Sequence, residues 1–256
     1  MSKFVDKLQS LSKSSATPMG FHPSVSELKS PAMLLVVGLS GTQVKESEIV
    51  AEVNADAGLI LSEGPSTKVV KQMVEAMGNV PLGVFVKGMS GEKIDELASL
   101  GCDFVVFDIR IPAAVLHKED IGKFLMIEPS LDQGFVRAIN SLEVDGVFIG
   151  SGSGESFVAV EHLLVCRRFV ELLEKPVMMT LPSLVTKAEL ISLWQAGVDG
   201  VVAPSTHSVE ALSELKKMTG DLPRGARGRR AKAGVILPHH GGDVAGEEDE
   251  EQEEEI

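Results

Sequence analysis

The sequence predicts an α/β fold, a single closed (β/α)8 barrel of parallel strands. Eight short apolar runs alternate with segments of helical period, and within each run the apolar residues are continuous. Parallel strands that are covered on both faces have this continuous pattern. Eight such strand–helix units within residues 31–219 match the barrel, near the short end of its usual size range. An open α/β sheet is the alternative.

The predicted strands recur all along the chain. They span residues 32–39, 57–62, 82–87, 103–109, 123–128, 146–150, 176–180 and 200–204. Each is followed by a polar or glycine-rich loop and then by a segment of helical period, of which residues 91–100, 155–175 and 186–197 are examples. The regular alternation predicts that the strands lie inside and the helices outside.

A second pattern, with a period of two strand–helix units, supports closure of the sheet. An aspartate comes just before each even-numbered strand: Asp56, Asp103, Asp145 and Asp199. Three odd-numbered strands instead begin at Pro31, Pro81 and Pro176, and proline suits the first residue of a strand. A four-fold repeat fits a closed ring in which alternate strands fill alternate layers of the core.

The sequence divides into three parts. Residues 1–30 form an N-terminal extension with one short amphipathic helix at 4–11, which could cover the barrel floor or stay mobile. Residues 31–219 form the barrel. Residues 220–256 are rich in Gly and Arg and then in Glu, and this composition predicts a disordered tail.

Composition and charge argue against several classes of function. The net charge is −13, with one Trp, no Tyr and no strongly basic face on the body of the chain, so we expect no nucleic-acid partner. No apolar run reaches the length of a membrane span, so we expect no membrane partner. The N-terminus lacks a secretory signal. Cys102 and Cys166 form neither a CxxC motif nor a disulfide framework, which predicts a reduced, cytoplasmic protein.

Two stretches, AGVDGVVAP (196–204) and EKPVMMTLPS (174–183), resemble those of the aldolase-type (β/α)8 barrels that bind phosphate or FMN. The resemblance covers nearly all of residues 31–219. It implies an active site at the C-terminal ends of the strands, in the loops that lead to the helices. Such stretches recur among lyases, isomerases, synthases and flavin oxidoreductases, so the resemblance implies no single reaction.

Three charged residues at neighbouring strand ends form the predicted catalytic centre: Lys87, Asp108 and Glu128. Partial desolvation would lower the pKa of Lys87, and its neutral amine could then form a Schiff base with a carbonyl. Asp108 and Glu128 could hold Mg²⁺, or one of them could be a general base. The alternative is a salt-bridge network that includes Arg110 and closes the barrel mouth.

A second set is predicted to bind the substrate or another anion. Arg110 could clamp a carboxylate with two hydrogen bonds. The glycine–serine loop after the sixth strand offers backbone N–H groups at a helix N-terminus, although it matches neither GxGxxG nor a P-loop. A capped, flexible loop is the alternative there. The predicted set comprises Arg110, Ser151, Gly152, Ser153, Thr180 and Ser205.

Two further strand-end residues have simpler interpretations. Glu63 is expected to sit near the start of the next helix, where its charge complements the helix dipole. His207, in the loop after the eighth strand, is a candidate acid–base group with a polar surface role as the alternative.

The leading functional prediction is an enzyme that acts on a small anionic metabolite, phosphorylated or carboxylate, by lyase- or isomerase-type chemistry. One alternative is an FMN-dependent oxidoreductase, with the flavin phosphate near the loops of strands six to eight. Another is a non-catalytic barrel that serves as a binding or scaffold protein, with its acidic tail (247–255) engaging a partner. A homo-oligomer is compatible with each.

Overall fold

The strands form a closed parallel barrel in a computed structural model that describes residues 2–14, 31–88, 90–150 and 157–223. Each strand pairs with the next one in the sequence, and β8 pairs with β1. This confirms the predicted (β/α)8 barrel. The strands are β1 (Leu34–Leu39), β2 (Ala57–Ile60), β3 (Leu82–Val86), β4 (Phe104–Phe107), β5 (Gly122–Ile127), β6 (Gly146–Ile149), β7 (Val177–Thr180) and β8 (Gly200–Pro204).

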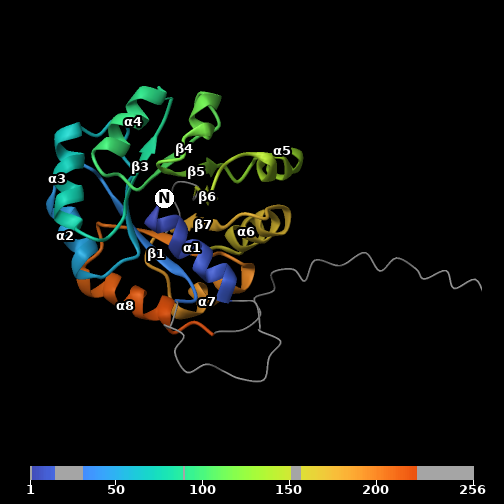
Figure 1. Ribbon diagram of the computed structural model, residues 1–256. Coiled ribbons are helices and arrows are strands. Elements are labelled where there is room, and N and C mark those ends of the chain that lie inside the picture. The colour runs from blue at the N-terminus through green and yellow to red at the C-terminus, as the bar shows by residue number, and fades with distance from the viewer. Residues whose placement is uncertain (1, 15–30, 89, 151–156, 224–256) are drawn as a thin grey trace, which may run out of the picture.

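Helices surround the barrel as an outer ring (Figure 1). They are α2 (Lys45–Glu52), α3 (Thr67–Met77), α4 (Gly91–Ser99), α5 (Gln133–Ala138), α6 (Val160–Leu172), α7 (Lys187–Ala196) and α8 (Val209–Gly220). Between β4 and β5 a short 3-10 turn, η1 (Ala113–His117), stands in place of the expected α-helix, and Pro112 precedes it. A second 3-10 turn, η2 (Ile139–Ser141), extends α5.

Side-chain caps fix where several of these helices begin. The hydroxyl of Ser66 accepts the backbone N–H of Val69 at the start of α3, at 3.3 Å. Thr186 and Glu189 form a reciprocal capping box at the start of α7, in which each side chain accepts a backbone N–H of the other residue. Backbone N–H groups that would otherwise lack partners in the first turn are thereby satisfied.

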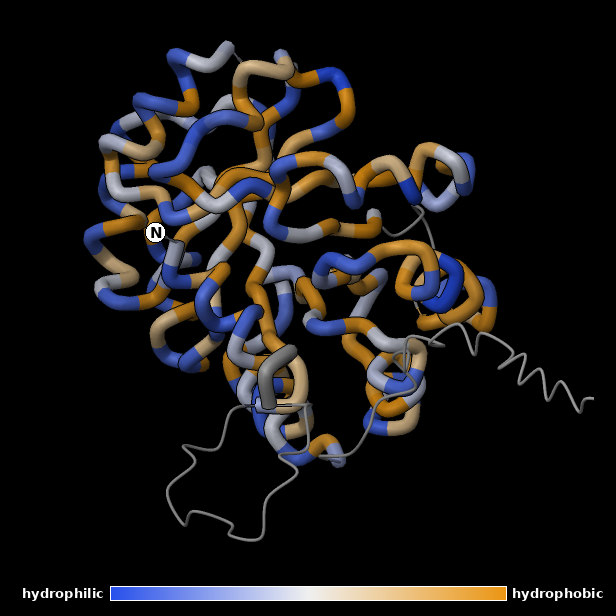
Figure 2. The backbone as a smooth tube through the Cα atoms, turned by 45° about the vertical axis from the view of Figure 1, so that its right-hand side comes forward, coloured by the Kyte–Doolittle hydropathy of each residue, from blue (hydrophilic) through white to orange (hydrophobic). Residues whose placement is uncertain are grey.

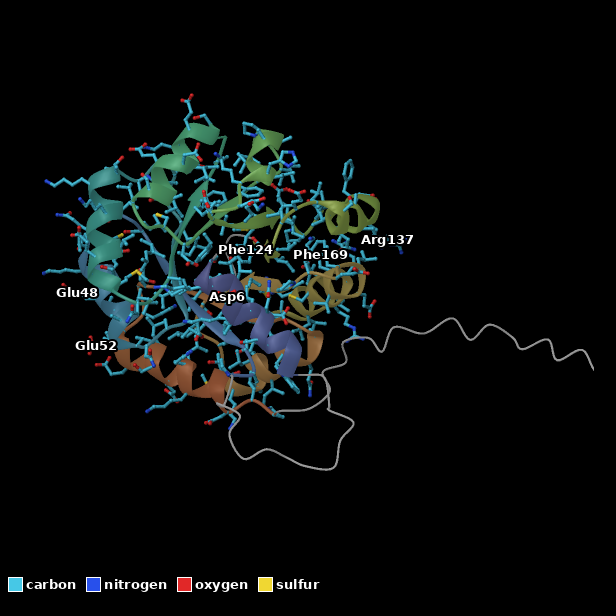
Figure 3. The ribbon with its side chains drawn as sticks, viewed as in Figure 1. Asp6, Glu48, Glu52, Phe124, Arg137 and Phe169 are labelled. Carbon is cyan, nitrogen blue, oxygen red and sulfur yellow. The ribbon has the colours of Figure 1, made fainter. Side chains whose placement is uncertain are left out.

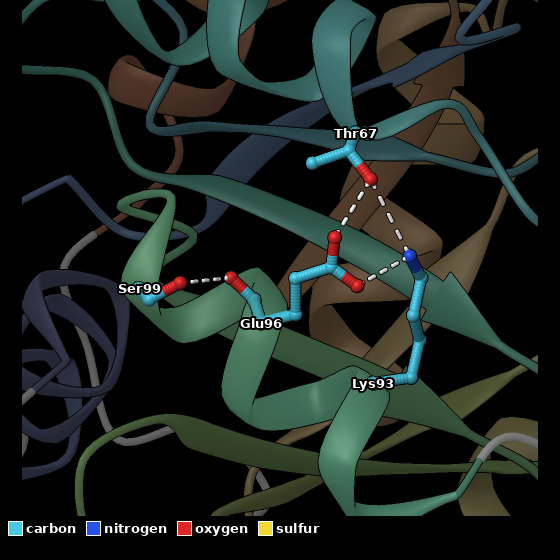
Figure 4. Close-up of polar contacts among 4 residues, drawn as sticks. All are labelled: Thr67, Lys93, Glu96 and Ser99. Carbon is cyan, nitrogen blue, oxygen red and sulfur yellow. Dashed lines mark hydrogen bonds and ion pairs between the residues drawn. The ribbon is translucent and has the colours of Figure 1, made fainter.

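The neighbouring helices α3 and α4 are also joined by polar contacts at the surface (Figure 4). The Glu96 carboxylate accepts hydrogen bonds from Thr67 Oγ1 at 2.9 Å and from Lys93 Nζ at 2.6 Å. These bonds, first the one from Lys93, hold the pKa of Glu96 below its usual value. The group is exposed, so the contacts position the two helices more than they stabilise the fold.

The core has two layers, which explains why the strands are apolar on both faces. One layer lies between the strands and the helices, and the tube in Figure 2 is mostly hydrophobic along the strands. The other layer lies inside the barrel, where Phe104, Phe124 and Phe148 pack edge to face at centroid distances of 5.5 and 5.4 Å. Figure 3 shows Phe124 among these interior side chains. Gly83 makes room for them, because a Cβ there would lie 2.2 Å from the Phe104 ring.

Helix α1 (Lys3–Ser14) covers the barrel floor, which we define as the end formed by the N-terminal ends of the strands (Figure 1). Phe4 is fully buried, and its ring stacks on Phe104 at a centroid distance of 4.5 Å. Leu8 and Leu11 join the same interior cluster. Of the two alternatives for the predicted N-terminal helix, the structure therefore has the one that closes the floor.

The aspartates of the four-fold repeat tie the strands together at the floor. The carboxylates of Asp56, Asp145 and Asp199 each accept, at 2.8 Å, a backbone N–H from the start of the preceding odd strand, donated by Leu35, Lys123 and Val177 respectively. The backbone N–H of each aspartate donates to the carbonyl of that same partner. The repeat seen in the sequence thus has a structural cause, a two-point contact between neighbouring strands.

Asp103 departs from this pattern. Its carboxylate accepts hydrogen bonds from Ser2 Oγ at 2.6 Å, from the Lys3 N–H at 2.8 Å and from the Phe4 N–H at 3.0 Å. The fourth aspartate therefore caps the first turn of α1 and holds the floor helix in place.

The described structure ends close to the predicted boundary between the barrel and the tail. Leu222 is buried, so the packed structure extends slightly beyond the predicted start of the tail at residue 220. The tail from residue 224 on and residues 15–30 lie outside the described residues. Among the helices that the structure describes, none has the length and apolar character needed to cross a bilayer.

Candidate active site

The three predicted catalytic residues directly follow three neighbouring strands at the barrel mouth, the end formed by the C-terminal ends of the strands. Phe85, Val106 and Met126 belong to the interior cluster on β3, β4 and β5. Side chains alternate along a strand, and the residues two positions further, each one residue beyond its strand, would continue this inward series. These residues are Lys87, Asp108 and Glu128. Phe85 and Met126 are half-buried, so they form an apolar base beneath the charged groups.

Lys87 forms an ion pair with Glu63, which follows β2. Its Nζ lies 2.9 Å from Glu63 Oε1, and the two side chains are 53% and 64% exposed. The hydrogen bond and the charge of Glu63, followed by the charge of Asp108, raise the pKa of Lys87 above its ordinary value. The predicted lowering by desolvation is wrong, because the amine reaches water and a carboxylate. Lys87 is therefore an ammonium group at neutral pH.

Asp108 shapes the loop after β4. Its Oδ1 accepts the backbone N–H of Arg110 at 3.0 Å. The charge of Asp108 raises the pKa of Lys87 and the charge of Arg110 lowers it, so both groups lie within electrostatic reach of the ammonium. Arg110 itself is exposed. The structure thus gathers Lys87, Asp108 and Arg110 on the β3–β4 side of the mouth.

Glu128 lies at the end of β5 and is exposed. Its backbone carbonyl accepts the Leu131 N–H at 3.1 Å, and Arg168 from α6 donates to the carbonyl of the next residue, Pro129. Within the described ranges, no side chain pairs with the Glu128 carboxylate.

A metal site at the mouth stays a prediction. Across the described part of the chain, no three His, Cys, Asp or Glu side chains gather in a way that could hold a metal ion. Asp108 and Glu128 alone would have to bind Mg²⁺ together with water.

The other predicted anion-binding residues lie at the ends of β6, β7 and β8 in the sequence. Thr180 ends β7 in the inward register, two residues after Met178, and is half-buried. Ser205 follows β8, and its hydroxyl lies 3.5 Å from the carboxylate of Glu46. Ser151, Gly152 and Ser153 lie outside the described residues. The Nε2 atom of His207 is buried without a hydrogen-bond partner among the residues that the structure describes.

Sequence reasoning missed one carboxylate at the mouth, Glu46, and gave another, Glu63, a different role. Glu63 was interpreted as part of a helix start, but Ser66 caps α3 and Glu63 turns to Lys87. The sequence already places Glu63 at the end of the second strand, and it continues the inward series of Ala57, Leu59 and Leu61. Glu46 carries no comparable signal, because its partner Ser205 is far away in the sequence.

Comparison with known proteins places the chain among solved barrels. No protein-family model matches the sequence, and no curated protein matches it. A variant tryptophan synthase α-subunit from Pyrococcus furiosus superposes with a TM-score of 0.57 at 15% identity, over 74% of this chain and 97% of that chain. Tryptophan synthase from M. tuberculosis, in an open form, superposes with a TM-score of 0.57 at 13% identity, over 86% and 97%.

The likeness is one of fold. A chain from Aquifex aeolicus VF5 superposes similarly, with a TM-score of 0.58 at 15% identity, over 86% of this chain and 98% of that chain. At these identities the comparison supports the (β/α)8 barrel fold alone, and the reaction has to be argued from the site.

Proposed function

We propose that this barrel is an enzyme that acts at its mouth on a small anionic metabolite, by lyase- or isomerase-type chemistry. The observation that carries the proposal is the position of Lys87, Asp108 and Glu128, which directly follow three neighbouring strands at the mouth. Characterised (β/α)8 enzymes have their active sites at this end of the barrel. The tryptophan synthase chains of similar fold are enzymes, which favours catalysis over a scaffold role.

Glu128 has the properties of a general base. Its carboxylate is exposed and, among the described residues, unpaired. In the proposed reaction it removes a proton from a carbon next to a carbonyl group, and the electron pair moves onto the carbonyl oxygen. In an isomerase the proton returns to a neighbouring carbon. In a lyase the electron pair instead expels a leaving group.

Lys87 and Arg110 supply positive charge on the adjacent strands. The raised pKa of Lys87 keeps its amine protonated, so its role is electrostatic and not nucleophilic. An ammonium and a guanidinium can hold the anionic group of the substrate and stabilise the negative charge that develops on the carbonyl oxygen. Asp108 positions Arg110 through the hydrogen bond to its backbone N–H.

The FMN-dependent oxidoreductase remains the alternative with weaker support. Its flavin phosphate would lie near the loops after β6, β7 and β8. Ser205, a donor on the β8 loop, already faces the Glu46 carboxylate. An absorption spectrum of freshly purified protein tests this alternative directly. A flavin band would show bound flavin, and it would favour redox chemistry over the proposed lyase- or isomerase-type reaction.

Hydrogen–deuterium exchange tests the proposed reaction. The protein is incubated in D2O with a panel of small carboxylates and phosphorylated carbonyl compounds, and loss of C–H signals is followed by proton NMR. We expect exchange in at least one compound, slowed about 100-fold or more by Glu128→Gln. Glu48→Gln is the matched control, since Glu48 points outward from α2 (Figure 3). Equal exchange in Glu128→Gln, or none with any compound, would refute the proposal.

A further inference from the structure

A carboxylate from the protein itself lies where the loops after β1 and β8 meet. Glu46, in the first turn of α2, is half-buried. Its Oε2 accepts the backbone N–H of Ser40 at 2.5 Å and lies 3.5 Å from the hydroxyl of Ser205. Its Oε1 accepts the hydroxyl of Ser40 in a short contact. One backbone N–H and two hydroxyl groups thus converge on this side chain.

The backbone around these donors is held in place. The Ser205 N–H donates to the Gly38 carbonyl at 2.8 Å, which continues the β8–β1 pairing into the loops. Gly41 has a φ of +70°, and a Cβ there would lie 2.5 Å from Ile60 Cγ2. Any other residue at position 41 would therefore push the β1 loop away from β2. The loop geometry that presents Ser40 to Glu46 is fixed by the fold.

These are the kinds of donor that bind phosphate in other barrels. Phosphate sites in (β/α)8 proteins form from the loops after the last strands, with backbone N–H groups and a helix N-terminus. Here the carboxylate of Glu46, which is part of the protein, already supplies a negative charge to these donors. A phosphate dianion would have to displace Glu46 or lie beside it, and like charges at such distances repel strongly.

The positive groups described above lie on the other side of the mouth. Lys87 follows β3 and Arg110 follows β4, whereas Glu46 joins β1 and β8. In the closed order of the strands, β4 is half-way round the barrel from β8. The cations of the mouth, with the carboxylates of Glu63 and Asp108 beside them, therefore lie on one side, whereas Glu46 has no cation among the contacts described above.

We propose that Glu46 determines substrate specificity by acting as a built-in anion. It closes the β8–β1 side to phosphate and directs the substrate's anionic group toward Lys87 and Arg110. A guanidinium makes a two-point contact with a carboxylate as well as with a phosphate. Because Glu46 occupies the donors of the β8–β1 side, the substrate class is small carboxylates without a phosphate ester. This inference rests on the proposed function only for the identity of the substrate; the exclusion of phosphate at Glu46 can be measured without any reaction.

Inorganic phosphate is the probe for that exclusion. We expect the melting temperature of the natural protein to be the same in phosphate and in chloride at equal ionic strength. In Glu46→Ala the vacated donors should bind phosphate and raise the melting temperature by several degrees in excess phosphate. Glu48→Ala, on the exposed face of the same helix, should behave like the natural protein. Adding Ser205→Ala to Glu46→Ala should abolish the gain, which excludes binding elsewhere.

Several results would overturn the inference. One is that the natural protein binds phosphate and that Ser205→Ala removes this binding. Another is that phosphate does not raise the melting temperature of Glu46→Ala. If Glu46→Ala does not fold, Glu46→Gln keeps the size of the side chain and removes its charge, and the absence of any gain in that variant has the same meaning. In the exchange assay, activity confined to phosphorylated compounds would also refute it. Loss of all exchange would refute the proposed function and leave the phosphate result standing.

Discussion

Asp103 holds Phe4 through a hydrogen bond of 3.0 Å between the carboxylate Oδ2 and the backbone N–H of Phe4. The contact joins the start of β4 to the first turn of α1. The Phe4 ring then stacks on Phe104, the residue that follows Asp103. One short stretch of β4 therefore both caps the floor helix and packs against it, so the floor should depend strongly on these residues.

Replacing Asp103 should destabilise the protein. Asp103→Ala removes the acceptor for two backbone N–H groups and the Ser2 hydroxyl, and loss of such a cap costs about 1–2 kcal/mol of unfolding free energy. Urea denaturation followed by circular dichroism measures the change. Asp120→Ala, at an exposed position, should change the free energy by less than about 0.5 kcal/mol. An equal effect of the two substitutions would contradict the capping role.

Replacing Phe4 should cost more. The Phe4 side chain is fully buried between α1 and the interior rings, and Phe4→Ala leaves a cavity that typically costs about 3–5 kcal/mol. Thermal unfolding should show a lowered melting temperature, with the far-UV spectrum preserved at low temperature. Phe135→Ala is the matched control, since the Phe135 side chain is 69% exposed on α5. If the Phe4 variant were as stable as this control, α1 would not be part of the core.

The ion pair between Lys87 and Glu63 makes a prediction about titration. Glu63→Gln removes the main cause of the raised pKa of Lys87, so the pKa should fall in this variant. NMR titration of the lysine side-chain carbons measures it. Glu92→Gln, in the first turn of α4, is the control. An unchanged Lys87 pKa in Glu63→Gln would show that the pair does not persist in solution.

The same pair has a defined effect on stability against pH. Because the folded pKa of Lys87 is raised, its contribution is fully present below the unfolded value of about 10.4 and is lost as pH rises through the folded pKa. The side chains are exposed, so the effect should be small. The difference in unfolding free energy between the natural protein and Glu63→Gln, measured by urea denaturation, should therefore disappear above the folded pKa of Lys87.

The two cysteines should be unreactive in the folded protein. Burial raises the pKa of both the Cys102 and the Cys166 thiols to about 12, and the thiolate is the reactive form. A thiol-specific disulfide reagent at pH 8 should label neither cysteine in the native state and both in concentrated urea. Rapid labelling of the native protein would mean that the helices covering these thiols open readily.

The sequence was sufficient for the architecture because its signals there are local. The continuous apolar strands, the helical periods and the aspartate before each even strand are all patterns among nearby residues. Three of the four aspartates, Asp56, Asp145 and Asp199, share one geometry at the floor. Lys87, Asp108 and Glu128 each directly follow the end of one of three neighbouring strands. Which way they face could not be predicted from the sequence, since alternation reverses the face at every step and the strand ends would have to be located to one residue. Their catalytic role stays a prediction.

The partners of these side chains could not be predicted in the same way. Whether the Lys87 amine is desolvated depends on Glu63 and on water at the mouth, and neither is visible in the residues around position 87. The contact between Glu46 and Ser205 depends on closure of the barrel, which brings the first and last strands together. The helix expected after β4 gave way to a 3-10 turn at Pro112, where the connection is short.

Asp56 receives a lysine from each end of the described chain. Lys7 of α1 donates to its backbone carbonyl at 2.8 Å, and Lys216 of α8 pairs with its carboxylate at 2.6 Å. The first and last helices therefore meet the barrel on the same side, away from the mouth. If this protein were attached to a surface or a carrier through α1 or α8, the barrel mouth would face away from the attachment point. Small molecules could then diffuse into the mouth without meeting the anchor.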